Sequence, residues 1–339
     1  MATITLSIND LLRVFWLTAL SFSVAMLLTP LLANFLYEHK VWKQIKDTAI
    51  TGEKAPVFHA LHKHKAQIPT MAGVLYWLVA ALIIALFALN RAETWLPLFT
   101  LVTAGALGLV DDVVNIRSKR SGIKGITSTV KFSWLTLIAG LGAYWFFSKL
   151  GWDVLQVPGF GIFSIGWWYV PLFMLVIIAT ANAVNITDGL DGLAGGLLAA
   201  AFSAYAVISL TQGKPELAAF CGIIVGVVLA YTWFNIYPAR FLMGDTGALA
   251  FGATLGVVAM LTNTTLVLIV IGGVFVIETL SSLIQIGSKK FFGRKLLISA
   301  PLHHHLEAMG WPETKVTMRL WVIGAILAII GLVIALFGR

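Results

Sequence analysis

Ten apolar stretches, each long enough for a membrane-crossing helix, dominate this sequence. A helix needs about 20 mostly apolar residues to cross the hydrocarbon core of a bilayer. Only 11% of the 339 residues are charged, whereas soluble domains carry about 25%. A larger core cannot explain this difference, because the surface of a soluble protein must still face water. We therefore predict an all-α, polytopic membrane protein with about ten transmembrane helices, forming a single domain over residues 1–339. The predicted spans are 11–36, 71–89, 96–113, 131–149, 168–185, 193–210, 217–235, 247–262, 266–287 and 319–337.

The positions of lysine and arginine predict the orientation of these spans. Most of the 23 basic residues lie in the loops 37–70, 114–131 and 288–319, or at Arg240. Cytoplasmic loops carry an excess of Lys and Arg, so these loops are expected on the cytoplasmic side and both termini outside. The net charge of +8 therefore reflects topology, and we expect no nucleic acid as a partner. The first apolar stretch is too long for a cleaved signal peptide.

The outer loops are short except for residues 150–167. Apolar residues alternate on both sides of Pro158-Gly159, which is typical of two short strands joined by a tight turn. We predict a small hairpin at the outer, periplasmic interface. The single cysteine, Cys221, lies in an apolar run, which excludes an intramolecular disulfide and argues against a cysteine-based zinc site.

Five aspartates are expected at cytoplasmic helix ends, although they come from three parts of the chain. Charges within spans are costly and usually functional. Single acids could also be caps or solvated helix ends, but an acid at a helix C-terminus opposes the macrodipole. Neighbouring residues on a helix point about 100° apart, so two adjacent acids would do different work. The five are Asp111, Asp112, Asp188, Asp191 and Asp245.

A polar pattern leads into two of these acids. Asn182, Asn185, Asp188 and Asp191 recur every three residues, and on a helix this spacing forms one stripe. A polar loop between two spans would explain the polarity but not the spacing. Asp245 precedes the eighth span, where it could cap the helix or lie beside a bound phosphate, which a helix N-terminus favours.

Carboxylates beside basic loops suit a phosphate-rich substrate with Mg²⁺, which prefers one or two carboxylates, water and phosphate oxygens. No Gly-x4-Gly-Lys-Ser/Thr motif occurs, which argues against a nucleotide-driven pump. His303, His304 and His305 are consecutive. Consecutive residues diverge on a helix and seldom bind one zinc ion, so phosphate binding or proton transfer is the favoured role.

Together, these motifs resemble the polyprenyl-phosphate N-acetylhexosamine-1-phosphate transferases over nearly the whole chain. The histidine loop running into Gly310-Trp-Pro312 is similar to the branch that uses UDP-MurNAc-pentapeptide rather than UDP-GlcNAc. The landmarks are Pro69-Thr-Met71, Asp111-Asp112, residues 182–192, Met243-Gly-Asp-Thr-Gly247, residues 278–285 and residues 300–307.

The resemblance implies a single integral-membrane glycosyl-1-phosphate transferase domain in the bacterial inner (cytoplasmic) membrane. The implied reaction moves phospho-MurNAc-pentapeptide from UDP-MurNAc-pentapeptide to undecaprenyl phosphate, which gives lipid I and UMP. This is the first membrane step of peptidoglycan synthesis. The implied cofactor is Mg²⁺, and the implied partners also include membrane lipid and a second copy of the chain in a homodimer.

The resemblance also implies roles for individual residues. Asp245 would bind Mg²⁺, and Asp111 and Asp112 would contact both the metal and the lipid phosphate, one of them as a base. His303 is the fourth expected catalytic residue. The expected substrate-binding residues are Lys65, Lys131, Asn182, Asn185, Asp188, Asp191, Leu242, Gln285, His304 and His305.

Some positions depart from the family pattern, and other functions stay open at this stage. The family has a phenylalanine, thought to stack on uracil, where this chain has Leu242 after Phe241. A relative that uses UDP-GlcNAc is one alternative. A proton-coupled transporter is another, although transporters place such acids near the bilayer midplane. An intramembrane aspartyl protease would leave the polar stripe and the histidines without a role.

Overall fold

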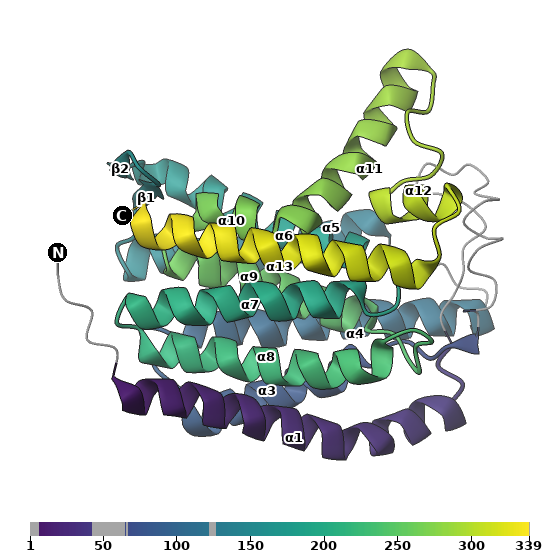
Figure 1. Cartoon of the computed structure of the whole chain (residues 1–339), viewed down its shortest axis with the longest axis horizontal. Helices are drawn as coiled ribbons and strands as arrows, with labels where there is room; N and C mark the ends of the chain where they lie inside the picture. The colour runs from purple at the N-terminus through teal and green to yellow at the C-terminus, as the bar shows by residue number, and fades with distance from the viewer. Residues whose placement is uncertain (1–6, 43–64, 66, 122–126, 339) are drawn as a thin grey trace.

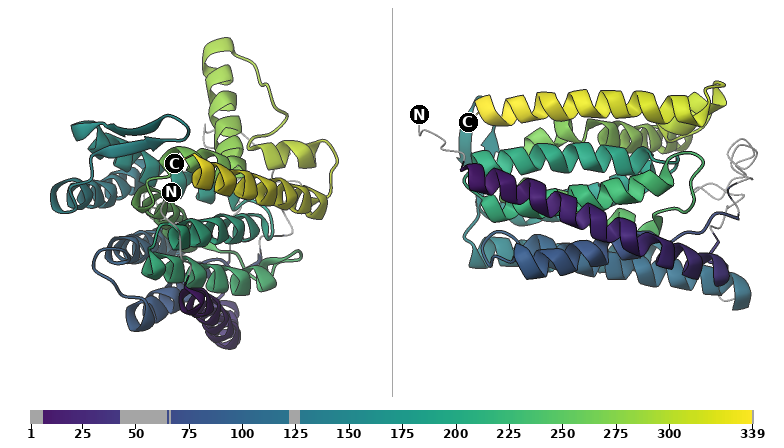
Figure 2. Two further views of the ribbon diagram at one scale, coloured as in Figure 1. Left: turned by 60° about the vertical axis from the view of Figure 1, so that its left-hand side comes forward. Right: turned by 60° about the horizontal axis from the view of Figure 1, so that its bottom comes forward.

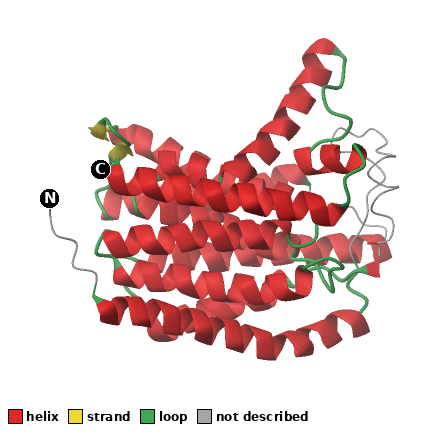
Figure 3. Ribbon diagram, in the orientation of Figure 1, coloured by secondary structure: helices red, strands yellow, loops and turns green. Residues whose placement is uncertain are grey.

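The structure, a computed structural model, describes residues 7–42, 65, 67–121 and 127–338. Helices dominate these ranges, and their regular strands are the two of a short hairpin (Figure 3). Two short helical turns, η2 (Trp145–Lys149) and η3 (Gly166–Trp168), flank that hairpin. The α-helices are α1 (Ile8–Glu38), α3 (Gly73–Phe87), α4 (Trp95–Ser121), α5 (Ser128–Tyr144), α6 (Tyr169–Thr187), α7 (Leu193–Thr211), α8 (Pro215–Asn235), α9 (Gly244–Leu261), α10 (Thr265–Ile271), α11 (Gly273–Phe292), α12 (Leu302–Ala308) and α13 (Glu313–Phe337).

The predicted multi-pass, all-α fold is confirmed. In the described ranges, eight helices are long and apolar enough to cross a membrane, and α10 with α11 makes a ninth, bent candidate. The apolar helix α3 has only 15 residues, so it is shorter than a typical span. These ten units correspond to the ten predicted apolar stretches.

The stretch 266–287, predicted as a span, is broken in the structure, because α10 and α11 meet at an angle of 84°. The bend falls at Gly272-Gly273. Glycine has low helix propensity because its backbone loses the most conformational freedom on ordering. Hydropathy continues unbroken through the bend, so composition alone did not reveal it. As a result, α11 projects away from the bundle (Figure 1).

Helix α9 lies at the centre of the bundle, between α4 and α6. Within its apolar window 89% of the residues are buried, against 22% for α1 and 28% for α13. Helices α1 and α13 lie on opposite sides of the bundle (Figure 2) and expose many large apolar side chains. In a chain with spans of this length, such faces are suited to contact with lipid.

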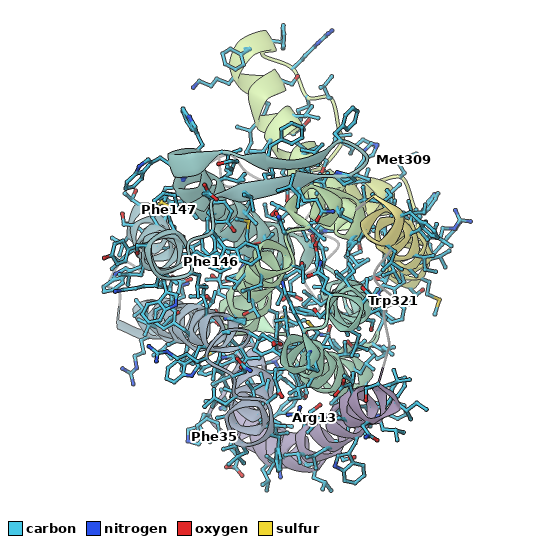
Figure 4. The ribbon with its side chains drawn as sticks, turned by 90° about the vertical axis from the view of Figure 1, so that its left-hand side faces the viewer. Arg13, Phe35, Phe146, Phe147, Met309 and Trp321 are labelled. Carbon is cyan, nitrogen blue, oxygen red and sulfur yellow. The ribbon has the colours of Figure 1, made fainter. Side chains whose placement is uncertain are left out.

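The predicted hairpin is confirmed; its place on the outer side of the membrane stays a prediction. Strand β1 (Val154–Val157) pairs antiparallel with β2 (Gly161–Ser164), with Val154 opposite Ser164. The hairpin lies across one end of the bundle (Figure 4), at which α1 begins and α13 ends. The backbone N–H of Gly159 donates to the carbonyl of Gly338 (3.1 Å), which ties the hairpin to the end of α13. Helix α12 and the end of α4 lie at the opposite end (Figure 1).

Candidate active site

Four helices bring a group of polar side chains together at the end of the bundle opposite the hairpin. The aspartate cluster consists of Asp111 and Asp112 on α4, Lys131 on α5, Asn185 on α6 and Asp245 on α9. The Lys131 ammonium lies 2.6 Å from Oδ2 of Asp111 and also pairs with Asp245. Asn185 Nδ2 donates to Oδ1 of Asp245 (2.7 Å). The cluster therefore contains three carboxyl groups and one ammonium group.

The two adjacent aspartates of α4 have different surroundings, as their positions on a helix predict. Asp112 Oδ2 accepts the backbone N–H of Thr246 (3.0 Å), which fixes it against the first turn of α9. Asp111 is 1% exposed and faces Lys131. Its Oδ1 atom has no hydrogen-bond partner among the residues that the structure describes. A buried carboxyl oxygen without a partner is costly, so this atom is available for a ligand.

Close backbone contacts hold the start of α9 against its neighbours. A Cβ atom on Gly108 of α4 would lie 2.3 Å from the carbonyl oxygen of Asp245, so glycine permits the close approach of these two helices. Gly244 has φ +74°, in the left-handed region that glycine adopts readily. The N–H of Gly73 donates to the Met243 carbonyl (2.9 Å). These contacts set the distance between the aspartates of α4 and Asp245.

Leu242, expected near uracil, is 5% exposed. Its backbone N–H donates to the carbonyl of Pro69 (2.8 Å), and its carbonyl accepts the N–H of Ala72 (3.1 Å). The preceding Phe241 is fully buried against aromatic rings that include Tyr76. The segment before Asp245 thus joins the core to the start of α3.

Lys65 and Asp191 lie in a second polar group, the lysine triad, which Glu313 of α13 completes. The Lys65 ammonium is 2.6 Å from Oδ1 of Asp191 and 2.5 Å from Oε1 of Glu313. Burial lowers the pKa of Lys65, but the two carboxylates raise it by more, so the net pKa lies above its ordinary value. The other carboxyl oxygen of Asp191 accepts the N–H of Ala239 (2.9 Å). The triad ties α13 to the loop between α6 and α7.

The side chains of the predicted stripe from Asn182 to Asp191 do not converge on a single site. Asn182 is exposed, and its side-chain amide donates to the carbonyl of Ile178 within the same helix (2.7 Å). Asn185 enters the aspartate cluster and Asp191 the lysine triad. Asp188 is the C-terminal cap residue of α6 and is partly buried. The helix ends between Asn185 and Asp191, so the three-residue spacing no longer describes one face.

The three histidines have different hydrogen-bond partners, although the rings of His303 and His304 lie edge to face with centroids 4.1 Å apart. His303 Nδ1 lies 2.9 Å from Oε2 of Glu278, and both side chains are fully buried. A Cβ atom on Gly189 would lie 2.4 Å from Nε2 of His303, so this ring faces the loop between α6 and α7. His304 Nδ1 lies 2.9 Å from Oε2 of Glu307.

Gln285 and the third histidine hold the chain that leads into α12. Gln285 Oε1 accepts the N–H groups of Leu296 and Leu297 (3.0 Å each), and its Nε2 donates to the Leu297 carbonyl (2.9 Å). The N–H of Ile298 donates to Nδ1 of His305 (3.2 Å). Both side chains therefore support this loop, and their expected role in substrate binding stays a prediction.

Three acids of the polar groups, Glu278, Glu307 and Glu313, were not among the predicted site residues. Glu278 falls in the apolar run before Gln285, where an isolated acid is costly in membrane and was a usable signal. Glu307 follows the histidines by two residues. Glu313 begins α13, where an acid in the first turn is ordinary, so only its contact with Lys65 shows its importance.

The carboxyl group of Glu307 is expected to make the folding stability of this protein depend on pH. Burial, and then the charge of Glu313, raise the pKa of its carboxyl from 4.5 to about 7, although Lys65 opposes the shift. The folded state therefore binds this proton more tightly than the unfolded state. The stabilisation is complete below the unfolded pKa and is lost as pH rises through about 7.

We expect the thermal unfolding midpoint in detergent to fall as pH rises from about 5 to 8. Glu307→Gln should weaken this dependence, whereas Glu38→Gln, at an exposed carboxyl of α1, should keep it. Equal pH profiles for wild type and Glu307→Gln would contradict the assignment. His304 Nδ1 lies 2.9 Å from the Glu307 carboxyl, so His304→Gln should be measured beside them.

Carboxyl oxygens are the atoms through which a metal ion would bind here. In the described ranges, no three His, Cys, Asp or Glu side chains converge in a way that could hold a metal ion. Lys131 bridges Asp111 and Asp245 instead.

Proteins of known name resemble this chain over nearly its whole length. The family model described as glycosyl transferase family 4 matches residues 94–263, which include the whole aspartate cluster. A phospho-N-acetylmuramoyl-pentapeptide-transferase of Geobacillus thermodenitrificans (strain NG80-2) is 39% identical over 93% of this chain and 96% of its own length. A protein of the same name from Chloroflexus aurantiacus (strain ATCC 29366 / DSM 635 / J-10-fl) is 38% identical over 97% of this chain and 91% of its own.

The chain belongs to the phospho-N-acetylmuramoyl-pentapeptide-transferases of glycosyl transferase family 4. The resemblance drawn from the motifs is therefore confirmed. The family relationship covers nearly the full length of the chain and of the relative.

Proposed function

We propose that this protein transfers phospho-MurNAc-pentapeptide from UDP-MurNAc-pentapeptide to undecaprenyl phosphate, with lipid I and UMP as products. The observation that carries this proposal is the family relationship, at 39% identity over nearly the whole chain, to enzymes named phospho-N-acetylmuramoyl-pentapeptide-transferase. The aspartate cluster supports it, because it gathers the acids and the lysine that phosphoryl transfer requires at one end of a membrane bundle.

The side chains of the cluster would divide the work. Asp111, buried and with one oxygen unpaired, would accept the proton of the lipid phosphate or hold that phosphate in place. Lys131, which lies between Asp111 and Asp245, would stabilise the charge on the transferring phosphoryl group. Asn185 would orient Asp245 through its 2.7 Å hydrogen bond.

We also propose Mg²⁺ as the cofactor, held by Asp111, Asp112 and Asp245. Their carboxyl oxygens are ligands that Mg²⁺ prefers, and Oδ1 of Asp111 is buried without a hydrogen-bond partner in the described parts of the chain. The three carboxyl groups do not converge on one point while Lys131 bridges Asp111 and Asp245, so the cation would take the place of that bridge. When bound, the cation would neutralise the charge of the diphosphate as the bond to UMP breaks.

The donor specificity can be tested directly. Purified protein in detergent, with undecaprenyl phosphate and Mg²⁺, should release UMP from UDP-MurNAc-pentapeptide and not from UDP-GlcNAc. Release from UDP-GlcNAc alone would replace the proposal with the related activity. Release from neither donor, by protein with an intact unfolding transition, would overturn it.

Glu278 is expected to act through His303, which we propose as a catalytic residue. With Glu278 ionised, its carboxylate accepts the Nδ1 proton of His303, and Nε2 is left free to accept a proton beside Gly189. Glu278→Ala would leave a buried Nδ1–H group unpaired, at a cost of about 1–3 kcal/mol. We expect kcat/KM to fall about tenfold or more, with a partial recovery in Glu278→Gln, whose amide oxygen can still accept the proton.

The orientation of the protein in the membrane is part of the proposal. We place the basic loops in the cytoplasm and both termini outside, in the bacterial cytoplasmic membrane. Reporter fusions after Ile298 and after Gly338 should report opposite sides of the membrane.

We also propose a homodimer, on the resemblance alone. Light scattering of the detergent-solubilised protein would measure its mass.

A further inference from the structure

The end of α11 forms a basic and aromatic surface outside the polar groups described above. Residues 289–296, which we call the α11 tip, read Lys-Lys-Phe-Phe-Gly-Arg-Lys-Leu. Phe291 and Phe292 are 75% and 74% exposed, and every residue from 290 to 296 is exposed. The tip lies away from the bundle, because α11 leaves it at the 84° bend (Figure 1).

The backbone of the tip is held from the inner side of α11. Ser288 Oγ donates to the carbonyl of Arg294 (2.8 Å), and Gln285 Oε1 accepts the N–H of Leu296 (3.0 Å). Gly293 ends the helix with φ +66°, and its N–H donates to the Lys289 carbonyl (3.2 Å). The exposed side chains of the tip are therefore displayed outward by a backbone that these bonds fix.

The exposed side chains of α11 change from apolar to basic and aromatic toward the tip, as expected of a helix that crosses from hydrocarbon into the headgroup layer. Earlier in the helix, Leu280, Leu283 and Ile284 are exposed and apolar, which suits the hydrocarbon region. At the tip, cationic side chains stand beside two exposed phenylalanines, and Lys290 lies over the ring of Phe291 (5.8 Å). A solvated basic loop would explain the charges but would leave both rings in water, which is unfavourable.

We propose that the α11 tip binds the headgroups of anionic phospholipids. Lys290, Arg294 and Lys295 supply the charge that anionic headgroups attract, and Phe291 and Phe292 enter the apolar layer below the headgroups. Binding fixes the position of α11 in the membrane. Through Ser281, whose hydroxyl accepts the N–H of Leu302 (2.9 Å), it also supports the start of α12. The proposal does not depend on the reaction that the enzyme catalyses.

Site-specific quenching tests the proposal in the full-length chain. Phe291→Cys is labelled with a thiol-reactive, environment-sensitive fluorophore; the native Cys221 is fully buried, and unsubstituted protein measures any background. The labelled protein is placed in phosphatidylcholine nanodiscs that contain a fixed fraction of spin-labelled phosphatidylglycerol or of spin-labelled phosphatidylcholine. Leu31→Cys on α1, 67% exposed, is the matched control.

We expect quenching at position 291 to be about threefold stronger with spin-labelled phosphatidylglycerol than with spin-labelled phosphatidylcholine. The ratio should be close to one at position 31. It should also approach one at position 291 after Lys290→Gln, Arg294→Gln and Lys295→Gln, in protein whose thermal unfolding is unchanged. Equal quenching by the two lipids at position 291 would overturn the proposal. An unquenched, water-like emission would also overturn it, and would point to a soluble partner.

Discussion

Asp245→Asn is expected to lower the rate of UMP release by about 10³-fold or more, the scale at which the loss of one transition-state contact in a buried site is felt. Asp245 pairs with Lys131 and accepts a hydrogen bond from Asn185, so its charge organises side chains from two other helices. Asparagine keeps the shape of the side chain and removes that charge. The measurement is UMP release from UDP-MurNAc-pentapeptide at saturating lipid acceptor.

The fold should survive this substitution, because Lys131 keeps its 2.6 Å contact with Asp111. Asp10→Asn, on α1 at the end of the bundle that carries the hairpin, is the matched control and should retain full activity. An Asp245→Asn enzyme with more than half of the wild-type rate would remove Asp245 from the proposed mechanism. A large drop in its unfolding temperature would show that the effect is one of folding.

Gly108→Ala is expected to destabilise the protein and to disable it at the same time. The added methyl group would lie 2.3 Å from the Asp245 carbonyl oxygen and 2.6 Å from Cα of Thr246. Both are backbone atoms, so α4 and α9 must move apart. Overpacking of this kind costs about 1–3 kcal/mol. The shift would also separate Asp111 from Asp245, and a displacement of about 1 Å can cost about 10²-fold in rate.

Gly140→Ala provides the control for this prediction. Gly140 lies within α5, and a Cβ atom there would meet only the Met174 side chain, at 3.8 Å. The substitution should leave the activity unchanged and raise the unfolding temperature slightly, because alanine favours helix. Thermal unfolding in detergent and UMP release should be measured for both variants. If the two behaved alike, α4 and α9 would not be in the close contact described here.

The convergence of the acids was predictable from the sequence. Asp111 and Asp112 end one apolar stretch and Asp245 begins another, so topology alone places them at the same membrane face. The structure brings them into one cluster with Lys131. The partners of Lys65 were not predictable, because Asp191 and Glu313 are 122 positions apart in the chain and meet only when α13 packs beside the loop that follows α6.

The amino-acid sequence by itself determined the number of apolar stretches in the bundle, the hairpin and the end of the bundle at which the acids lie. Each follows from a local property, namely stretch length, turn chemistry or loop charge. Tertiary structure alone decided the bend at Gly272, the use of Gln285 to hold a loop, and the division of the 182–191 stripe among different neighbours. The physical reason is that lipid is as apolar as a protein core. Hydropathy therefore marks which residues avoid water, and only packing distinguishes a side chain that faces lipid from one that faces another helix.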